Sequence, residues 1–292
     1  MQLKQANRKS VKLRLNLASP SGFGKTYSAL LLAFGITNDW TKIAVIDTEN
    51  DSASLYAHLG NFQILSLAPP FTTQRYIEAI QACENAHMEV IVIDSITHVW
   101  KGQGGLLEYQ NSLGGRYQDW ARVSPLYQYW LNAILQSKCH VITTNRKKQG
   151  YNMITENNKT KVEKAGLDDE IRDGYDYEVT VALEIINANH LARASKDRTG
   201  LFMGKPEFVI SSETGKQLLQ WCNAGTSVED EVKSLIQSAK DTNELLEIFN
   251  QYPSCQAILQ AEFAQKRQSL EVRNTMPIFN PQKINANGIH NR

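Results

Sequence analysis

Residues 19–26, Ser19-Pro20-Ser21-Gly22-Phe23-Gly24-Lys25-Thr26, decide how the rest of the chain is interpreted. An apolar, strand-like run at 13–18 precedes them, and a helical pattern follows them through residue 34. A glycine-rich turn in that context, ending in Lys-Thr, is typical of a loop whose backbone N–H groups wrap phosphates. We therefore predict that residues 19–26 bind ATP, with Lys25 on the β- and γ-phosphates and the Thr26 hydroxyl on Mg²⁺.

The first position of this loop departs from the usual pattern, G-x-x-x-x-G-K-[ST], because Ser19 stands in place of glycine. Serine has less backbone freedom than glycine, but it is small enough to leave the loop intact. A glycine-rich turn followed by a chance Lys-Thr is the alternative. The strand before the loop and the helix after it argue against that alternative.

Composition bounds the class of protein. The 292 residues suffice for one large domain and a small appendage, and the formal net charge of +1 excludes a uniformly basic surface for nucleic acid. The four cysteines lack metal-ligand spacing, and the first residues do not resemble a secretory signal. Because no apolar stretch is long enough to span a bilayer, we expect a soluble, cytoplasmic protein with no membrane partner.

Alternating strand and helix patterns predict an α/β fold with a mostly parallel sheet covered by helices. The expected strands are 13–18, 42–47, 63–66, 90–94 and 140–144, with helices at 73–86 and 125–137 between them. Runs at 177–185 and 190–195, joined by a turn at 187–189, indicate a β-hairpin at the C-terminal edge of the sheet. A short strand at 207–210 and a helix at 213–222 complete the pattern.

Three regions follow along the chain. Residues 1–225 are expected to form the nucleotide-binding core, and residues 226–272 a small helical region with helices at 228–240, 242–250 and 255–270. Residues 273–292 are rich in Asn and lack acidic residues, and we expect a disordered tail there.

Two carboxylates follow predicted parallel strands beside the phosphate loop. Asp94 ends the run VIVID and is placed to hold Mg²⁺, although it could merely cap the next turn. Many phosphate-loop ATPases have a glutamate directly after that aspartate, but here the residue is Ser95. Glu49, at the end of the neighbouring strand, could instead orient the attacking water.

The order IAVIDTEN (43–50), VIVIDS (90–95) and VITTNR (141–146) resembles the core of RecA-like recombinases. The runs at 176–183 and 194–200 resemble more closely the phage-type RecA-like ATPases, a group of AAA-domain or nucleotide-binding proteins that includes the Sak-type single-strand annealing ATPases. The resemblance covers about 13–225 and is weak over the C-terminal helices. It implies a RecA-like core, with the hairpin at its edge.

This resemblance implies roles for single residues. Glu49 matches the catalytic glutamate, and Tyr56 lies where an adenine-stacking tyrosine is found, with a core aromatic as the alternative. Thr144 lies where a polar residue, usually an amide, senses the γ-phosphate. Lys196 and Arg198 match cations that a neighbouring subunit inserts against the phosphates, which implies a ring or filament with shared active sites. An exposed basic turn is the alternative for these two cations.

The stretch 146–172 is predicted to be a long loop that binds single-stranded DNA, because cations with an interleaved aromatic suit a phosphate backbone and stacked bases. A second loop at 101–118 would assist it. The alternative is that these charges form a solvated surface that binds no DNA. The candidate contacts are Arg146, Lys147, Lys148, Tyr151, Lys159, Lys161 and Lys164 in the first loop and Arg116 in the second.

Three functions remain open. The preferred one is an oligomeric, DNA-dependent ATPase that promotes annealing or recombination, in a bacterial host cell if the chain is phage-encoded. A single-strand binding protein or another recombination factor would be its further partner. The second is an ATP-gated switch or assembly protein with little turnover and no DNA role. The third, a small-molecule kinase, is disfavoured because nothing marks an acceptor site.

Overall fold

A computed structural model describes residues 11–156, 159–224 and 228–275, apart from the side chains of 151–165 and 272–275. Contacts divide the chain into a large unit, Ser10–Ala224, and a second unit that contains Gly225–Arg292. Residues 225–227, between the expected core and the expected helical region, and the part of the expected tail at 276–292 lie outside the described residues.

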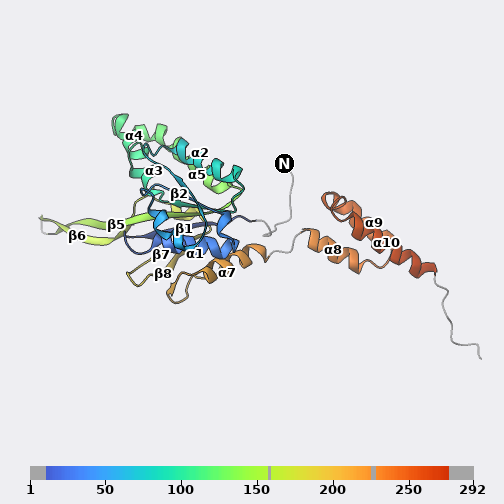
Figure 1. The fold of residues 1–292 in the computed structure, drawn as a ribbon. Helices are drawn as coiled ribbons and strands as arrows, with labels where there is room; N and C mark the ends of the chain where they lie inside the picture. The colour runs from blue at the N-terminus through green and yellow to red at the C-terminus, as the bar shows by residue number, and fades with distance from the viewer. Residues whose placement is uncertain (1–10, 157–158, 225–227, 276–292) are drawn as a thin grey trace, which may run out of the picture. The chain divides into compact units, whose positions relative to one another are not determined.

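The large unit is built on one mixed sheet (Figure 1). Its strand order is β3-β2-β4-β5-β1-β7-β8-β9. The strands from β3 to β7 in this order pair in parallel, and β8 and β9 are antiparallel. This arrangement confirms the predicted fold class. The strands are β1 Arg14–Ser19, β2 Ile43–Asp47, β3 Gln63–Ser66, β4 Val90–Asp94, β5 His140–Glu156, β6 Lys159–Asp169, β7 Val181–Ile185, β8 Leu191–Asp197 and β9 Phe208–Val209.

Helices cover both faces of this sheet, so its central strands are buried on both sides (Figure 1). In β4, Ile91 and Ile93 belong to the core beneath α2 and α5, whereas Val90 and Val92 belong to the core beneath α1 and α7. The continuous apolar run of β4 follows from this double burial. The helices of this unit are α1 Lys25–Thr37, α2 Thr73–Asn85, α3 Thr97–Lys101, α4 Leu106–Ser112, α5 Trp120–Gln136, α6 Tyr175–Glu178 and α7 Ser212–Asn223.

The backbones of α1 and α7 approach each other closely because each presents a glycine. A Cβ atom built on Gly35 would lie 1.9 Å from the carbonyl oxygen of Ser212. A Cβ atom built on Gly215 would lie 2.3 Å from the carbonyl oxygen of Leu32. Only glycine at these two positions permits the observed contact, which holds α1 against the helix that closes the domain.

The prediction of a long loop at 146–172 is wrong. Strand β5 continues to Glu156, and β6 pairs with it to form an antiparallel ribbon (Figure 1). In this ribbon Lys147 pairs with Asp169. A two-stranded ribbon can satisfy its backbone hydrogen bonds without an apolar face, so its polar sequence lacks the alternation that marks a sheet strand.

Two smaller expectations also need correction. The segment 101–118 is not one loop, because α4 occupies Leu106–Ser112. The strand expected from residue 177 starts only at Val181, because Tyr175–Glu178 forms the short helix α6. Tyr175 is buried against Trp130 in the core, and this tertiary contact holds the helical turn in place.

The C-terminal unit consists of α8 Val228–Ser238, α9 Thr242–Gln251 and α10 Gln260–Thr275. The helices enclose a small core of their own that includes Val232, Leu245 and Phe263. The third helix starts later than expected, because a 3₁₀ turn, Pro253–Cys255, precedes it. Among the described helices of both units, none has the length and apolar character needed to cross a membrane.

Candidate nucleotide site

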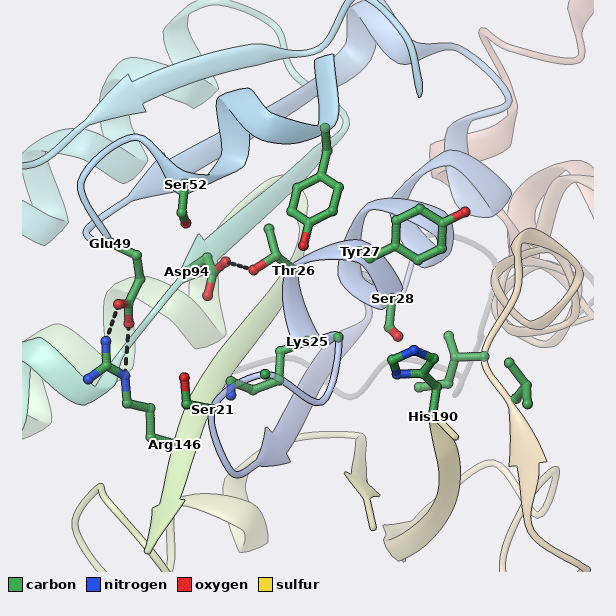
Figure 2. Close-up of a pocket in the computed structure, with 15 residues that line it drawn as sticks. Ser21, Lys25, Thr26, Tyr27, Ser28, Glu49, Ser52, Asp94, Arg146 and His190 are labelled. Atoms are coloured by element: carbon green, nitrogen blue, oxygen red, sulfur yellow. Dashed lines mark hydrogen bonds and ion pairs between the residues drawn. The ribbon is translucent and has the colours of Figure 1, made fainter. Parts of the chain in front are cut away.

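A pocket of about 530 Å³ opens where the phosphate loop meets the C-terminal ends of the parallel strands (Figure 2). This edge of an open parallel sheet is where ligands of such folds bind, because the loops that follow the strands converge there. The lining residues are Ser21, Gly22, Gly24, Lys25, Thr26, Tyr27, Ser28, Glu49, Ser52, Tyr56, Asp94, Arg146, His190, Val209 and Ile210.

The phosphate loop has the backbone that its sequence requires. Gly22 and Gly24 adopt φ values of 84° and 86°, which only glycine reaches without strain, and Gly24 caps the N-terminus of α1. Ser19 is the last residue of β1, so its backbone is extended and has no need of glycine. Its substitution therefore leaves the loop geometry intact.

Lys25 lies along the inside of this loop. Its Nζ donates hydrogen bonds to the carbonyl oxygens of Ser19, at 3.1 Å, and Pro20, at 3.0 Å. Burial lowers the pKa of the Lys25 ammonium, while the negative charges of Asp94 and Glu49 oppose that shift. An ammonium group held among neutral carbonyls is suited to bind a phosphate.

Asp94 joins the loop to the sheet. Its Oδ2 accepts a hydrogen bond from Thr26 Oγ1 at 2.5 Å, and its Oδ1 accepts one from Thr144 Oγ1, also at 2.5 Å. The carboxyl group is 2% exposed, and burial raises its pKa. A threonine hydroxyl beside one carboxylate fits Mg²⁺, which binds few protein oxygens and completes its shell with water and phosphate oxygens.

Thr144 reaches this site through Asp94. Its hydroxyl is fully buried and is not among the described residues that line the pocket. The lining residue nearest to it in the chain is Arg146, two positions later. Thr144 therefore supports the Asp94 carboxylate, and its role as a sensor of the γ-phosphate stays a prediction.

Glu49 is positioned by the turn that follows β2. Asp47 Oδ1 accepts a hydrogen bond from the Glu49 backbone N–H at 2.6 Å, and Asp47 Oδ2 accepts one from the Ala53 N–H at 2.7 Å. Beyond this turn, the Glu49 side chain lies at the pocket with Ser95 Oγ donating to its Oε1 at 2.9 Å. Ser95, at the position where many phosphate-loop ATPases have a glutamate, thus orients the carboxylate of Glu49.

Arg146, predicted to contact nucleic acid, lines this pocket. Its guanidinium forms two hydrogen bonds with the Glu49 carboxylate: Nε donates to Oε1 at 3.2 Å, and Nη2 donates to Oε2 (Figure 2). Strand pairing sets Arg146 opposite Ser19, at the start of the phosphate loop. Its place just after the predicted strand 140–144 was the sequence signal for this position, and its contact with nucleic acid stays a prediction.

A second layer of polar groups supports this carboxylate. The Ser95 backbone N–H donates to Thr48 Oγ1 at 2.8 Å, and that hydroxyl lies 2.8 Å from His98 Nδ1. Burial lowers the pKa of His98, so its neutral form is favoured. Because His98 belongs to α3, this layer connects the turn after β2 with the segment that follows β4.

The other end of the pocket is aromatic and apolar. Tyr56, from the 3₁₀ helix Ser52–Leu59, has its ring centroid 5.8 Å from that of Tyr27. His190 lies across from Tyr27, with Nδ1 at 2.9 Å from the Phe23 carbonyl oxygen (Figure 2). The rings and the nearby Val209 and Ile210 provide flat, apolar surface for a nucleobase. Sequence reasoning found Tyr56 but missed the other four, which carry no local signal.

Several predicted DNA contacts have partners within the protein. Lys147 Nζ lies 3.1 Å from Glu184 Oε1 and 3.7 Å from Asp169 Oδ1, and its side chain is 11% exposed. Arg116 pairs with Asp119, whereas Lys148 is exposed. The side chains of Tyr151, Lys159, Lys161 and Lys164 lie outside the described residues, although their backbone belongs to the β5–β6 ribbon.

Lys196 and Arg198 lie on β8 and in the turn after it, and neither is among the described residues that line the pocket. Lys196 Nζ donates to the carbonyl oxygen of Asp176 at 2.9 Å, and Arg198 Nη2 donates to that of Tyr177 at 2.9 Å. Both cations thus bind the carbonyls of α6 within this chain. A role at the pocket of a neighbouring subunit stays a prediction.

The fold and the site define a P-loop nucleotide-binding ATPase core. They combine a parallel sheet, a phosphate loop that leads into α1, and Asp94 at the end of the nearby strand β4. Comparison with protein families agrees: a family model described as an AAA domain matches residues 11–209. The chain belongs to this AAA-domain family. No curated protein matches the chain.

Proposed function

We propose that this protein hydrolyses ATP with Mg²⁺, binds single-stranded DNA, and promotes annealing or recombination as an oligomer of the phage Sak-type group. The observation that carries the ATPase part is the convergence of Lys25, Thr26, Asp94 and Glu49 on one pocket. The four side chains come from the phosphate loop and from the ends of two neighbouring strands. Together they supply a cation for phosphate, oxygens for a metal and a carboxylate for water.

The chemistry follows from these positions. Loop N–H groups and Lys25 would bind the phosphates, and the Glu49 carboxylate would orient a water molecule and accept its proton. Thr26 and Asp94 would hold Mg²⁺, which neutralises phosphate charge when bound. Tyr56, with Tyr27 and His190, would enclose the nucleobase.

Support for the DNA and oligomer parts comes from the surface. Lys148 is exposed on β5, at the base of a ribbon whose sequence carries further lysines. In the segment between α4 and α5, Tyr117 is 92% exposed beside Arg116, whose side chain is 65% exposed, so an aromatic and a cation are available together. Binding of bases to such aromatics would not require sequence recognition. Lys196 and Arg198 would serve a neighbouring protomer's pocket.

A second candidate, an ATP-gated switch or assembly protein with little turnover, is favoured by one contact. The Glu49 carboxylate is held by Arg146 and Ser95 at the same time, so its oxygens are already engaged. A carboxylate kept in this state would not activate water, although ATP could still bind.

ATP turnover with and without single-stranded DNA separates the candidates, measured on the native chain and on Glu49→Gln. We expect DNA to stimulate turnover, and Glu49→Gln to lower it by about 10²- to 10⁴-fold with nucleotide still bound. Glu89→Gln is the control, because Glu89 is exposed at the opposite end of β4. Binding without turnover or DNA retention would favour the switch, and phosphate transfer to a small molecule would favour a kinase.

A further inference from the structure

We infer that Arg146 exchanges partners: it pairs with Glu49 in the structure described here, and with the terminal phosphate when a nucleoside triphosphate is bound. The exchange would release the Glu49 carboxylate only when a triphosphate is present, and would let the pocket distinguish ATP from ADP. This inference rests on the proposed function, because it requires nucleotide on the phosphate loop.

The position of Arg146 allows both partners. Its side chain lines the same pocket as Lys25, Thr26 and Asp94, the groups placed for the phosphates and the metal. The guanidinium now uses two of its N–H groups on one carboxylate. Its planar fork matches phosphate oxygens as well as carboxylate oxygens, so a terminal phosphate can take the place of Glu49.

The backbone of Arg146 is fixed, so the exchange involves its side chain. The Arg146 N–H donates to Thr97 Oγ1 at 2.9 Å, and its carbonyl oxygen accepts from the Glu170 N–H at 2.8 Å. Pairing with Ser19 adds a third restraint. These contacts hold the base of the side chain beside the phosphate loop while the guanidinium at its end can rotate.

The ion pair between Arg146 and Glu49 is partly exposed to solvent. The Arg146 side chain is 39% exposed and that of Glu49 is 20% exposed, and pairs of this kind contribute little net stability. A terminal phosphate brings more negative charge than a carboxylate, in a pocket that also holds the Lys25 cation. The phosphate should therefore displace Glu49 from Arg146.

Glu49 would keep its position at the pocket after Arg146 releases its carboxylate. Ser95 Oγ still donates to its Oε1, and Asp47 still fixes the turn that carries it. The carboxylate would stay at the pocket with one oxygen free for water. Arg146 would thus act as a positioning residue for Glu49 and as the group that recognises the terminal phosphate.

The test is calorimetric binding of ADP and of the non-hydrolysable β,γ-imido analogue of ATP to the full chain. We expect Arg146→Ala to weaken the analogue by about 10- to 100-fold, the range for a lost charged hydrogen-bond pair, and to leave ADP unchanged. Arg146→Lys, which keeps the charge without the fork, should give an intermediate loss. Glu49→Gln frees Arg146 and should tighten the analogue by about two- to fivefold, again without effect on ADP.

Arg122→Ala is the matched control, because Arg122 is exposed on α5 and should change neither affinity. Equal losses for ADP and the analogue, or no loss in Arg146→Ala and Arg146→Lys, would overturn the inference. A chain that binds neither nucleotide, or whose Lys25→Ala variant binds both as tightly as the native chain, would instead refute the proposed function, and this inference with it.

Discussion

Replacement of Gly35 by alanine should loosen the contact between α1 and α7. The added Cβ would lie 1.9 Å from the Ser212 carbonyl oxygen and 2.9 Å from the Gly215 Cα. Both are backbone atoms of a helix, so neither can rotate away as a side chain could. Because Cβ atoms do not approach other heavy atoms within 3.0 Å, the helices would have to separate by about 1 Å.

Two effects of opposite sign decide how Gly35→Ala changes the free energy of unfolding. Forcing atoms into a well-packed core costs about 1–3 kcal/mol, whereas glycine to alanine in a helix interior stabilises it by up to about 1 kcal/mol. The clash with backbone puts the cost at the upper end of its range, so we expect a net loss of about 1–2 kcal/mol. For a domain of this size, that corresponds to a fall in Tm of about 2–8 °C.

Urea unfolding of the full chain, followed by the fluorescence of tryptophans such as the buried Trp130, measures this loss. Gly215→Ala should behave similarly, because its Cβ would lie 2.3 Å from the Leu32 carbonyl oxygen. Gly166→Ala is the control, since its Cβ would meet no atom within 4 Å. If Gly35→Ala were stabilised by about 1 kcal/mol, helix propensity alone would be acting and the packing argument would be refuted.

Two further predictions concern the pocket and the pH dependence of stability. Lys25→Ala should weaken ATP binding at least about tenfold by calorimetry, and equal affinity would contradict the site assignment. Burial lowers the pKa of His140 to about 4, and Leu13 N–H donates to its Nδ1 at 3.1 Å. The unfolded chain binds a proton on His140 near pH 6.5, whereas the folded chain binds it only near pH 4. The free energy of unfolding is therefore highest above pH 6.5 and decreases by about 3 kcal/mol as the pH falls to 4. His140→Asn should flatten that part of the urea-stability profile against pH, and an unchanged slope would exclude His140 as its source.

Local sequence patterns predicted the scaffold of this protein. The five expected parallel strands from 13–18 to 140–144 are present. The pattern is clearest in central strands such as β4, because a strand buried on both faces needs a continuous apolar run. The phosphate loop was equally readable, because Gly22 and Gly24 must adopt positive φ and must lie next to Lys25 in the chain. Such features are encoded by neighbouring residues.

The β5–β6 ribbon marks the limit of that reasoning. Its strands pair residues such as Lys147 and Asp169 across a polar sequence, and no apolar face is required. The same stretch of sequence is therefore compatible with a loop or with a ribbon. Only the pairing itself, a contact between distant residues, distinguishes the two.

The amino-acid sequence alone determined the parallel sheet, the phosphate loop and the acidic strand ends, because each depends on a short run of adjacent residues. Only the tertiary structure decided that Arg146 pairs with Glu49, and that His190 lies against Phe23. These partners are 97 and 167 positions apart. Their contacts depend on the strand order β2-β4-β5-β1-β7, which side-chain packing over the whole domain establishes.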